Sequence, residues 1–162
     1  MNGFDRRRFL LSGFLLILGL SGCSDRRPKG GFEAIHWDRD MCERCKMVVS
    51  ERKYAAEIVD PKTNKVYKFD DLGCAVLWLK EEKIPWADRA KIWVTDAKTG
   101  KWLDARKAIY TDDSITPMAY GIAAFSEKTF PKGHKALDFE TVSKIIEKIE
   151  AKNNERRGLE TP

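Results

Sequence analysis

The sequence lacks the features that several protein classes require. Glycine accounts for 11 of its 162 residues, too few for a collagen-like repeat, and the 43% hydrophobic content excludes a disordered chain. The apolar run from Phe9 to Leu20 has 12 residues, which is too short to span a bilayer comfortably. This composition excludes a polytopic membrane protein and predicts a soluble globular domain.

Common catalytic and nucleotide-binding motifs are also missing. We find no Gly-rich phosphate loop, no nucleophile elbow with a Ser-His-Asp order and no HExxH motif. The formal net charge is +5, and removal of residues 1–22 would lower it to +3, because three Arg and one Asp lie there. Since nucleic-acid binding needs a clustered positive face and the remaining Lys and Asp are scattered, we expect no nucleic-acid partner.

The N-terminus resembles the export signal of a bacterial lipoprotein. Arg6, Arg7 and Arg8 precede the apolar run, and Leu20-Ser21-Gly22-Cys23 is similar to a lipobox. The segment from Asp5 to Leu11 also resembles a twin-arginine signal. We therefore expect a signal peptide over 1–22, acylation of Cys23, a lipid-anchored tether over 23–35, a folded domain over 36–152 and a flexible tail over 153–162. The domain would face the periplasm from the inner or outer membrane.

Hydrophobic periodicity predicts an α+β fold. Expected strands are 47–50, 54–59, 66–69, 91–95, 102–104, 119–125 and 136–139. One expected helix begins after a cap at Asp70 or Asp71 and ends before Pro85, and a second covers 141–152. The turn sequence Asp-x-Lys-Thr-[Asn/Gly]-Lys occurs at 60–65 and again 36 residues later at 96–101, which suggests an internal duplication.

The cysteines are the most informative residues. Once Cys23 is acylated, Cys42, Cys45 and Cys74 remain, and an odd number leaves at least one thiol free. Met41, Cys42, Cys45 and Met47 place four sulfur atoms within seven residues. Thiolate and thioether ligands together favour Cu(I). Two alternatives stay open: Cys42 and Cys45 could form a disulfide or redox pair, or a structural zinc site could recruit Cys74 with His36 or His134.

Other candidates have simpler explanations beside the functional one. Cys74 fits a buried core cysteine better than a ligand. Asp70 and Asp71 fit helix caps better than general acids. Met118 follows Pro117 at a loop end from which it could reach a site, or it could fill a gap in the core. Of the two histidines, His36 is the better ligand candidate, because it precedes Cys42 by six residues.

Four ordered segments resemble the NosL family, lipid-anchored accessory proteins of nitrous oxide reductase maturation. They are Cys42-x-x-Cys45-x-Met47-Val48-Val49, residues 54–59, the Phe-Asp-Asp-Leu-Gly-Cys segment at 69–74, and the segment from Pro117 to Phe125. The resemblance runs over about residues 38–140. It implies two related β-hairpin-plus-helix units in a NosL/MerB-like fold, similar to that of the organomercurial lyase MerB, without implying lyase activity.

The resemblance also implies function and ligands. It implies a periplasmic, membrane-tethered Cu(I) chaperone that delivers copper for nitrous oxide reductase assembly, with the reductase or its maturation machinery as partner and with no enzymatic activity. Cys45, Met47 and Met118 match the family's ligand positions, and Cys42, Cys74 and His36 are weaker candidates. The family has Gly where this chain has Lys46, a residue for which a positive φ is unfavourable.

Overall fold

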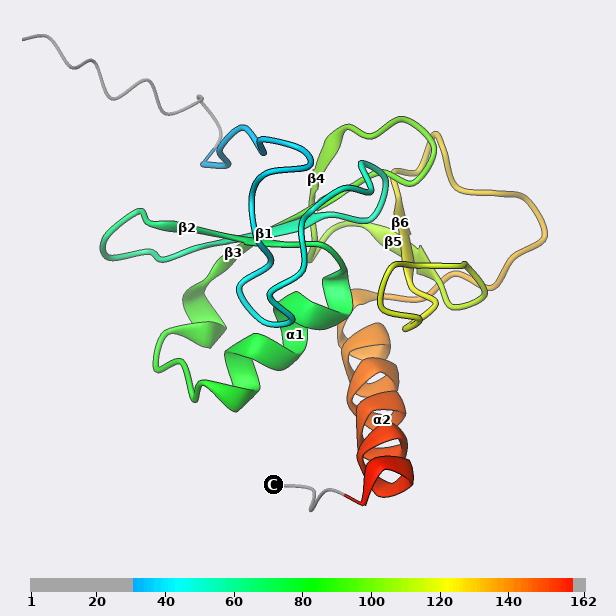
Figure 1. The fold of residues 1–162 in the computed structure, drawn as a ribbon. Helices are drawn as coiled ribbons and strands as arrows, with labels where there is room; N and C mark the ends of the chain where they lie inside the picture. The colour runs from blue at the N-terminus through cyan, green and yellow to red at the C-terminus, as the bar shows by residue number, and fades with distance from the viewer. Residues whose placement is uncertain (1–30, 159–162) are drawn as a thin grey trace, which may run out of the picture.

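The computed structural model describes residues 31–158. The predicted signal peptide, Cys23 and most of the predicted tether lie outside this range. Six strands and two α-helices follow one another as β1 (Ala56–Val59), β2 (Val66–Phe69), α1 (Leu72–Glu81), the 3-10 helix η1 (Ala87–Arg89), β3 (Lys91–Thr95), β4 (Trp102–Asp104), β5 (Ile109–Thr111), β6 (Ala123–Phe125) and α2 (Phe139–Arg157). The fold is therefore mixed, with antiparallel sheets and two α-helices, as the sequence predicts (Figure 1).

The first four strands form one antiparallel sheet in the order β2-β1-β3-β4. The β1-β2 and β3-β4 hairpins meet at β1 and β3, where Ala56 pairs with Val94 and Ile58 pairs with Ile92. A second, two-stranded sheet contains β5 and β6. The two hairpins that share the repeated turn sequence are thus neighbours in a single sheet.

The two hairpin turns have the same hydrogen bonds. Asp60 Oδ1 accepts from the backbone N of Lys62 at 2.7 Å, and Asp96 Oδ1 accepts from Lys98 N at 3.0 Å. The left-handed position is filled by Asn64 (φ 57°) and by Gly100 (φ 68°), residues that tolerate a positive φ. These are Asx turns, in which a carboxylate replaces a backbone acceptor.

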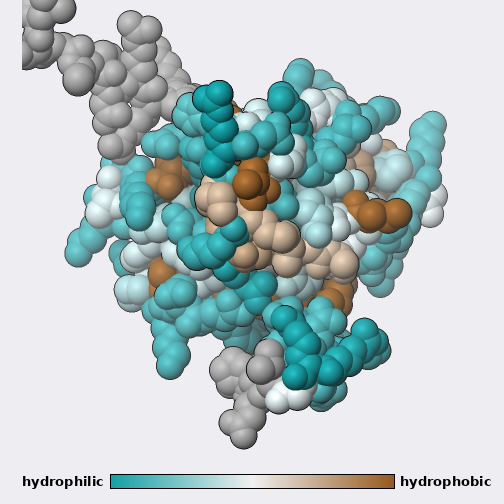
Figure 2. Space-filling model, in the orientation of Figure 1, coloured by the Kyte–Doolittle hydropathy of each residue, from teal (hydrophilic) through white to brown (hydrophobic). Residues whose placement is uncertain are grey.

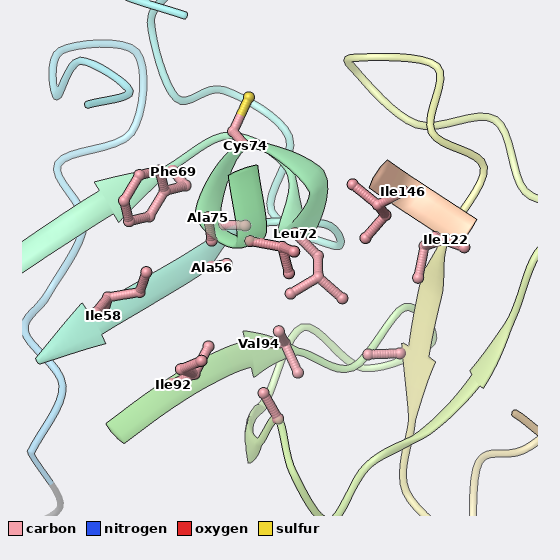
Figure 3. Close-up of a cluster of buried hydrophobic side chains, with 14 of the residues drawn as sticks. Ala56, Ile58, Phe69, Leu72, Cys74, Ala75, Ile92, Val94, Ile122 and Ile146 are labelled. Atoms are coloured by element: carbon pink, nitrogen blue, oxygen red, sulfur yellow. The ribbon is translucent and has the colours of Figure 1, made fainter. Parts of the chain in front are cut away.

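Helix α1 covers one face of the four-stranded sheet (Figure 1). Its N-cap is Asp71, whose side chain accepts from Gly73 N, a cap that satisfies a backbone donor without a partner inside the helix. The aliphatic side chains of Ala56, Ile58 and Ile92 point towards this helix (Figure 3). Helix α2 packs against α1 and β5, with Val142 and Ile146 buried.

Residues 31–35, which we expected in the tether, pack against the domain. The ring of Phe32 lies 5.4 Å from those of Trp93 and Trp102, and Ile35 is buried. The backbone N of Glu33 donates to Glu57 Oε2 at 3.0 Å. The packing of the Phe32 ring and the backbone hydrogen bond therefore hold residues 31–35 against the domain.

Several boundaries differ from expectation. Residues 47–50 form only an isolated bridge between Met41 and Val48, because the loop turns too tightly for a strand. The strand predicted over 119–125 is shortened to β6, and 136–139 contributes only a bridge at Leu137. Helix α2 continues to Arg157, into the predicted tail, and ends at Gly158 with φ 68°, a left-handed helix cap. No helix within residues 31–158 has the length and hydrophobicity needed to cross a membrane.

Candidate metal centre

Residues 41–48 form a closed loop, here called the thiol loop. The bridge between Met41 and Val48 closes it, and inside it Cys42 N donates to Met47 O at 2.8 Å. Lys46 N donates to Cys42 O at 3.1 Å, which completes one tight turn. This turn, rather than a helix N-terminus, carries both cysteines of the CxxC motif.

Cys74 joins these two cysteines from the first turn of α1. The Sγ atoms of Cys42, Cys45 and Cys74 all lie within 4.8 Å of one another, and all three cysteines are free. Figure 3 shows the sulfur of Cys74 projecting away from the aliphatic cluster below α1. Because a zinc–sulfur bond is about 2.3 Å long, one ion can contact two sulfurs about 4 Å apart, so small shifts would let all three thiols hold one metal.

The three thiols differ in acidity. The hydrogen bond from Cys74 lowers the pKa of Cys42 to about 5. The same hydrogen bond, together with burial, raises the pKa of Cys74, and burial raises that of Cys45. Cys42 is therefore the thiol that ionises most readily, and a metal held by all three sulfurs would displace the protons that remain on the others.

Met118 approaches the thiols from a second loop, residues 114–121, here called the methionine loop. A cavity of about 330 Å³ is lined by Cys45 and Met118 together with Arg44, Glu81, Tyr120, Glu150, Asn153 and Arg157. Met118 N donates to Asp71 Oδ2 at 3.2 Å. The thioether of Met118 therefore shares a solvent-accessible cavity with one of the three thiols.

The start of α1 and the methionine loop fit closely because residue 73 is glycine. A Cβ at Gly73 would lie 2.1 Å from Cδ2 of Tyr120, a distance that no real contact allows. Tyr120 is buried, and its hydroxyl donates to Glu150 Oε2 at 2.8 Å. The aromatic ring therefore occupies the space of a missing side chain one residue before Cys74.

An ion-pair network encloses one side of the cavity. The guanidinium of Arg44 donates two hydrogen bonds to Glu81, at 2.8 and 2.7 Å, and one to Glu150 Oε1 at 2.8 Å. It also donates to the Tyr120 hydroxyl at 3.0 Å. Arg44 lies inside the CxxC motif, so this network ties the thiol loop to both helices.

The remaining predicted ligands are exposed or contact carboxylates. Met47 is 46% exposed on the thiol loop, and His36 is exposed with Nδ1 at 3.5 Å from Asp40 Oδ2. His134 pairs with Asp113 at 3.0 Å.

Figure 2 shows apolar side chains on one face as small patches among hydrophilic ones. The large exposed apolar residues within 31–158 are Met41, Met47, Val48 and Ile115.

Sequence reasoning missed the roles of Arg44 and Asp71. From the sequence we assigned Arg44 no ligand or structural role, whereas its guanidinium is bound to carboxylates on two helices. We interpreted Asp71 as a helix cap, which it is, but its second oxygen also accepts from the methionine loop. Nothing in the spacing along the chain indicates either contact, because the partners are 37 to 106 residues away.

Comparisons with known proteins give a family and a fold for this chain. A family model described as NosL matches residues 35–141. A solved structure, the copper chaperone NosL from Shewanella denitrificans, superposes with a TM-score of 0.56 at 17% sequence identity, covering 70% of this chain and 96% of that one. At this identity the likeness shows a shared fold. A search of curated proteins found no match.

Proposed function

Because this chain belongs to the NosL family, we propose that it is a copper chaperone that binds Cu(I) at the thiol cluster and releases it to a partner protein. The observation that carries the proposal is the cluster of three free sulfurs within 4.8 Å, beside a methionine that shares a cavity with one of them. Sulfur-only coordination suits a soft monovalent ion. The protein would act by transfer and have no enzymatic activity.

The ligand set combines both loops. We propose that Cys45 and Met118 bind the ion where it faces the cavity, and that Cys42 supplies the thiolate from the buried side. Cys74 lies close enough to complete the set. Met47, proposed from the family motif, would approach from solvent, and His36 is the weakest candidate because its contact is with Asp40.

Transfer needs a position at which an incoming ligand can attack the metal. The cavity beside Cys45 and Met118 gives such access, whereas Cys42 and Cys74 are fully buried. An acceptor sulfur or imidazole would enter from the cavity, form a shared complex and displace the neutral thioether, which is the weakest donor. The thiolates would leave last.

The partner and location of the protein also belong to the proposal. The family resemblance supports nitrous oxide reductase, or its maturation machinery, as the acceptor. The lipobox-like sequence supports acylation of Cys23 and a position on the periplasmic side of a membrane in the cell envelope. The two turns with matching hydrogen bonds support two related hairpin-plus-helix units.

An anaerobic Cu(I) titration against a competing chelator tests copper binding. We expect the reduced protein to bind one equivalent tightly, and we expect Cys45→Ser and Met118→Ala each to weaken that binding. Met41→Ala is the matched control, because Met41 is an exposed thioether outside the cavity; its affinity should equal that of the wild type. The absence of competitive binding in the wild-type protein would contradict the proposal.

Dependence on particular residues distinguishes the two alternatives. A thiol-disulfide oxidoreductase would depend on Cys42 and Cys45 and be indifferent to Met118. A structural zinc site would require Cys74, and chelation of zinc would unfold the protein. The structure gives the redox alternative little support, because the CxxC motif lies on a turn and Cys42 is fully buried, whereas redox cysteines are partly exposed.

A further inference from the structure

We propose that Asp71 is a positioning residue of the metal centre, whose single carboxylate fixes Met118 of the methionine loop relative to Cys74 of α1. The contribution of Asp71 to copper binding rests on the proposed function. The positioning itself is a property of the metal-free protein and can be tested without copper.

The two oxygens of Asp71 have different partners. Oδ1 accepts from Gly73 N at 2.7 Å, one residue before Cys74. Oδ2 accepts from the backbone N of Met118 at 3.2 Å. The carboxylate therefore bridges two backbone amides that are 45 positions apart in the sequence, each at or beside a sulfur-bearing residue.

The methionine loop has few other attachments to α1. Within the described residues, Ser114 N donates to Gly121 O at 2.9 Å, and Ala119 N donates to Thr116 O at 3.0 Å, so both bonds stay inside the loop. The Tyr120 side chain packs over Gly73, but its hydroxyl bonds to Glu150 on α2. The Asp71 carboxylate also bonds to the Thr116 side chain of the same loop, so Asp71 links the start of α1 by hydrogen bonds both to the methionine loop and to the backbone of Met118.

Capping alone does not explain this residue. Asn and Ser cap helices about as well as Asp, and a buried carboxylate costs free energy unless all its oxygens are bonded. Asp138 illustrates the ordinary case, because it caps α2 by accepting from Thr141 N at 2.8 Å while remaining exposed. Asp71 is fully buried, and its second oxygen accounts for why a carboxylate stands there.

The backbone beside Met118 needs such a restraint. Ala119 has a φ of 58°, a left-handed conformation that costs about 1 kcal/mol or more for a residue with a Cβ. Such a conformation persists where the surroundings enforce it. A neutral thioether is a weak ligand, so its contribution to binding depends on being held in place before the metal arrives.

Methionine methyl NMR of the metal-free protein tests the positioning directly. Asp71→Asn and Asp71→Ser both keep an oxygen for the Gly73 amide and remove the acceptor for Met118. We expect the methyl signal of Met118, assigned with Met118→Ala, to shift and sharpen in both variants. The signal of exposed Met47 should stay unchanged. Asp138→Asn is the matched control, in which the Met118 signal should not change.

Copper affinity supplies the second readout. Asp71→Asn should weaken Cu(I) binding by about the same factor as Met118→Ala, and the double variant should bind no more weakly than either single variant, because both remove the same contribution. Either Asp71 variant suffices if the other fails to fold, which thermal unfolding would reveal.

The outcomes separate this inference from the proposed function. If the wild type binds no Cu(I), the proposed function fails, and the methyl signals still decide the role of Asp71. If the wild type binds Cu(I) but the Asp71 variants keep the wild-type methyl signal and affinity, the inference is overturned. Fully additive losses in the double variant would overturn it as well.

Discussion

Lys46 has a backbone conformation that is poorly suited to its residue type. It lies between Cys45 and Met47 with a φ of 59°, the left-handed region in which a Cβ is unfavourable. Its ammonium lies 3.5 Å from Glu43 Oε2 and is largely exposed, so this ion pair contributes little. The thiol loop imposes the conformation, because Lys46 N must donate to Cys42 O to close the turn.

Replacing Lys46 by glycine should stabilise the protein. We expect Lys46→Gly to raise the free energy of unfolding by about 0.5–1 kcal/mol, since relief of the left-handed strain exceeds the extra backbone entropy of glycine in the unfolded chain. Urea unfolding of the reduced protein measures this change. Lys46→Ala is the control: it also removes the ammonium but keeps the Cβ, so an equal gain there would assign the effect to charge instead of backbone conformation.

At the scale of elements, Arg44 is the main polar link between the thiol loop and the helices. Its side chain is largely buried between Glu81 on α1 and Glu150 on α2. Burial alone would raise the pKa of Glu150, but the hydrogen bonds from Arg44 and Tyr120 outweigh it and lower that pKa. The helices and the loop are therefore held by charges that depend on one another.

Removing the Arg44 charge should destabilise the protein strongly at neutral pH. Arg44→Met leaves Glu150 buried, with the Tyr120 hydroxyl and Arg157, at 3.3 Å, as its remaining partners. Loss of one partner of a buried ion pair costs about 3 kcal/mol. Chemical unfolding at pH 7 checks this value. Arg89→Met is the matched control, because Arg89 and Asp88 form an exposed pair, and we expect a change below about 0.5 kcal/mol there.

Lowering the pH should reduce the difference in free energy of unfolding between Arg44→Met and the wild type. The lowered pKa of Glu150 means that its stabilising contribution is present above the ordinary carboxyl value of about 4.5 and is lost as the pH falls through the lower folded-state pKa. The variant lacks this contribution, so its loss of unfolding free energy relative to the wild type should become smaller as the pH falls. A deficit that stays constant from pH 7 to pH 3 would show that packing, and not charge, is what Arg44 provides.

At the scale of the whole molecule, the four-stranded sheet is covered on both faces. Helix α1 packs on one face (Figure 1), and residues 31–35 lie against the other, where Glu33 N bonds to Glu57. All four residues of β1 are consequently buried, including Glu57. Glu57 Oε1 and the neighbouring Trp93 Nε1 have no hydrogen-bond partner. Residues 31–35 therefore cover two polar atoms that lack hydrogen bonds.

Glu57 should make the fold less stable as the pH rises. Burial raises its pKa to about 7, so the folded state holds this proton more tightly than the unfolded chain does. The resulting stability is complete below about pH 4.5, declines between pH 4.5 and pH 7, and is lost above pH 7. The 2.5-unit interval corresponds to roughly 3 kcal/mol.

Glu57→Gln isolates this effect. The amide cannot ionise, so we expect the variant to be more stable than the wild type at pH 8 and close to it at pH 5, as measured by urea midpoints across that range. The hydrogen bond from the Glu33 backbone amide and the charge of Lys68 lower the pKa of Glu57, while the charges of Glu33 and Asp40 raise it. Parallel pH profiles for the two proteins would contradict the prediction. Glu127→Gln, at an exposed position in the loop after β6, should leave the profile unchanged.

Local chemistry made much of the fold predictable. Strands β2, β3 and β4 have the expected bounds, because alternating β-branched and aromatic residues end at strong turn sequences. Asp71 and the apolar spacing after it define the start of α1. Strand β5 was not predicted, since its three residues are too few for a periodic signal and it is stabilised by its pairing with β6.

The sequence by itself determined which chemistry is available: three thiols, a CxxC turn, a methionine after a proline, and an order of segments typical of one family. Tertiary structure alone decided that Cys74, buried in the core as expected, also lies with Cys42 and Cys45, and that Asp71 and Arg44 link the loops to the helices. The reason is physical. Turns and helices depend on neighbours along the chain, whereas these contacts join residues brought together only when the hydrophobic faces of the sheet and helices are buried.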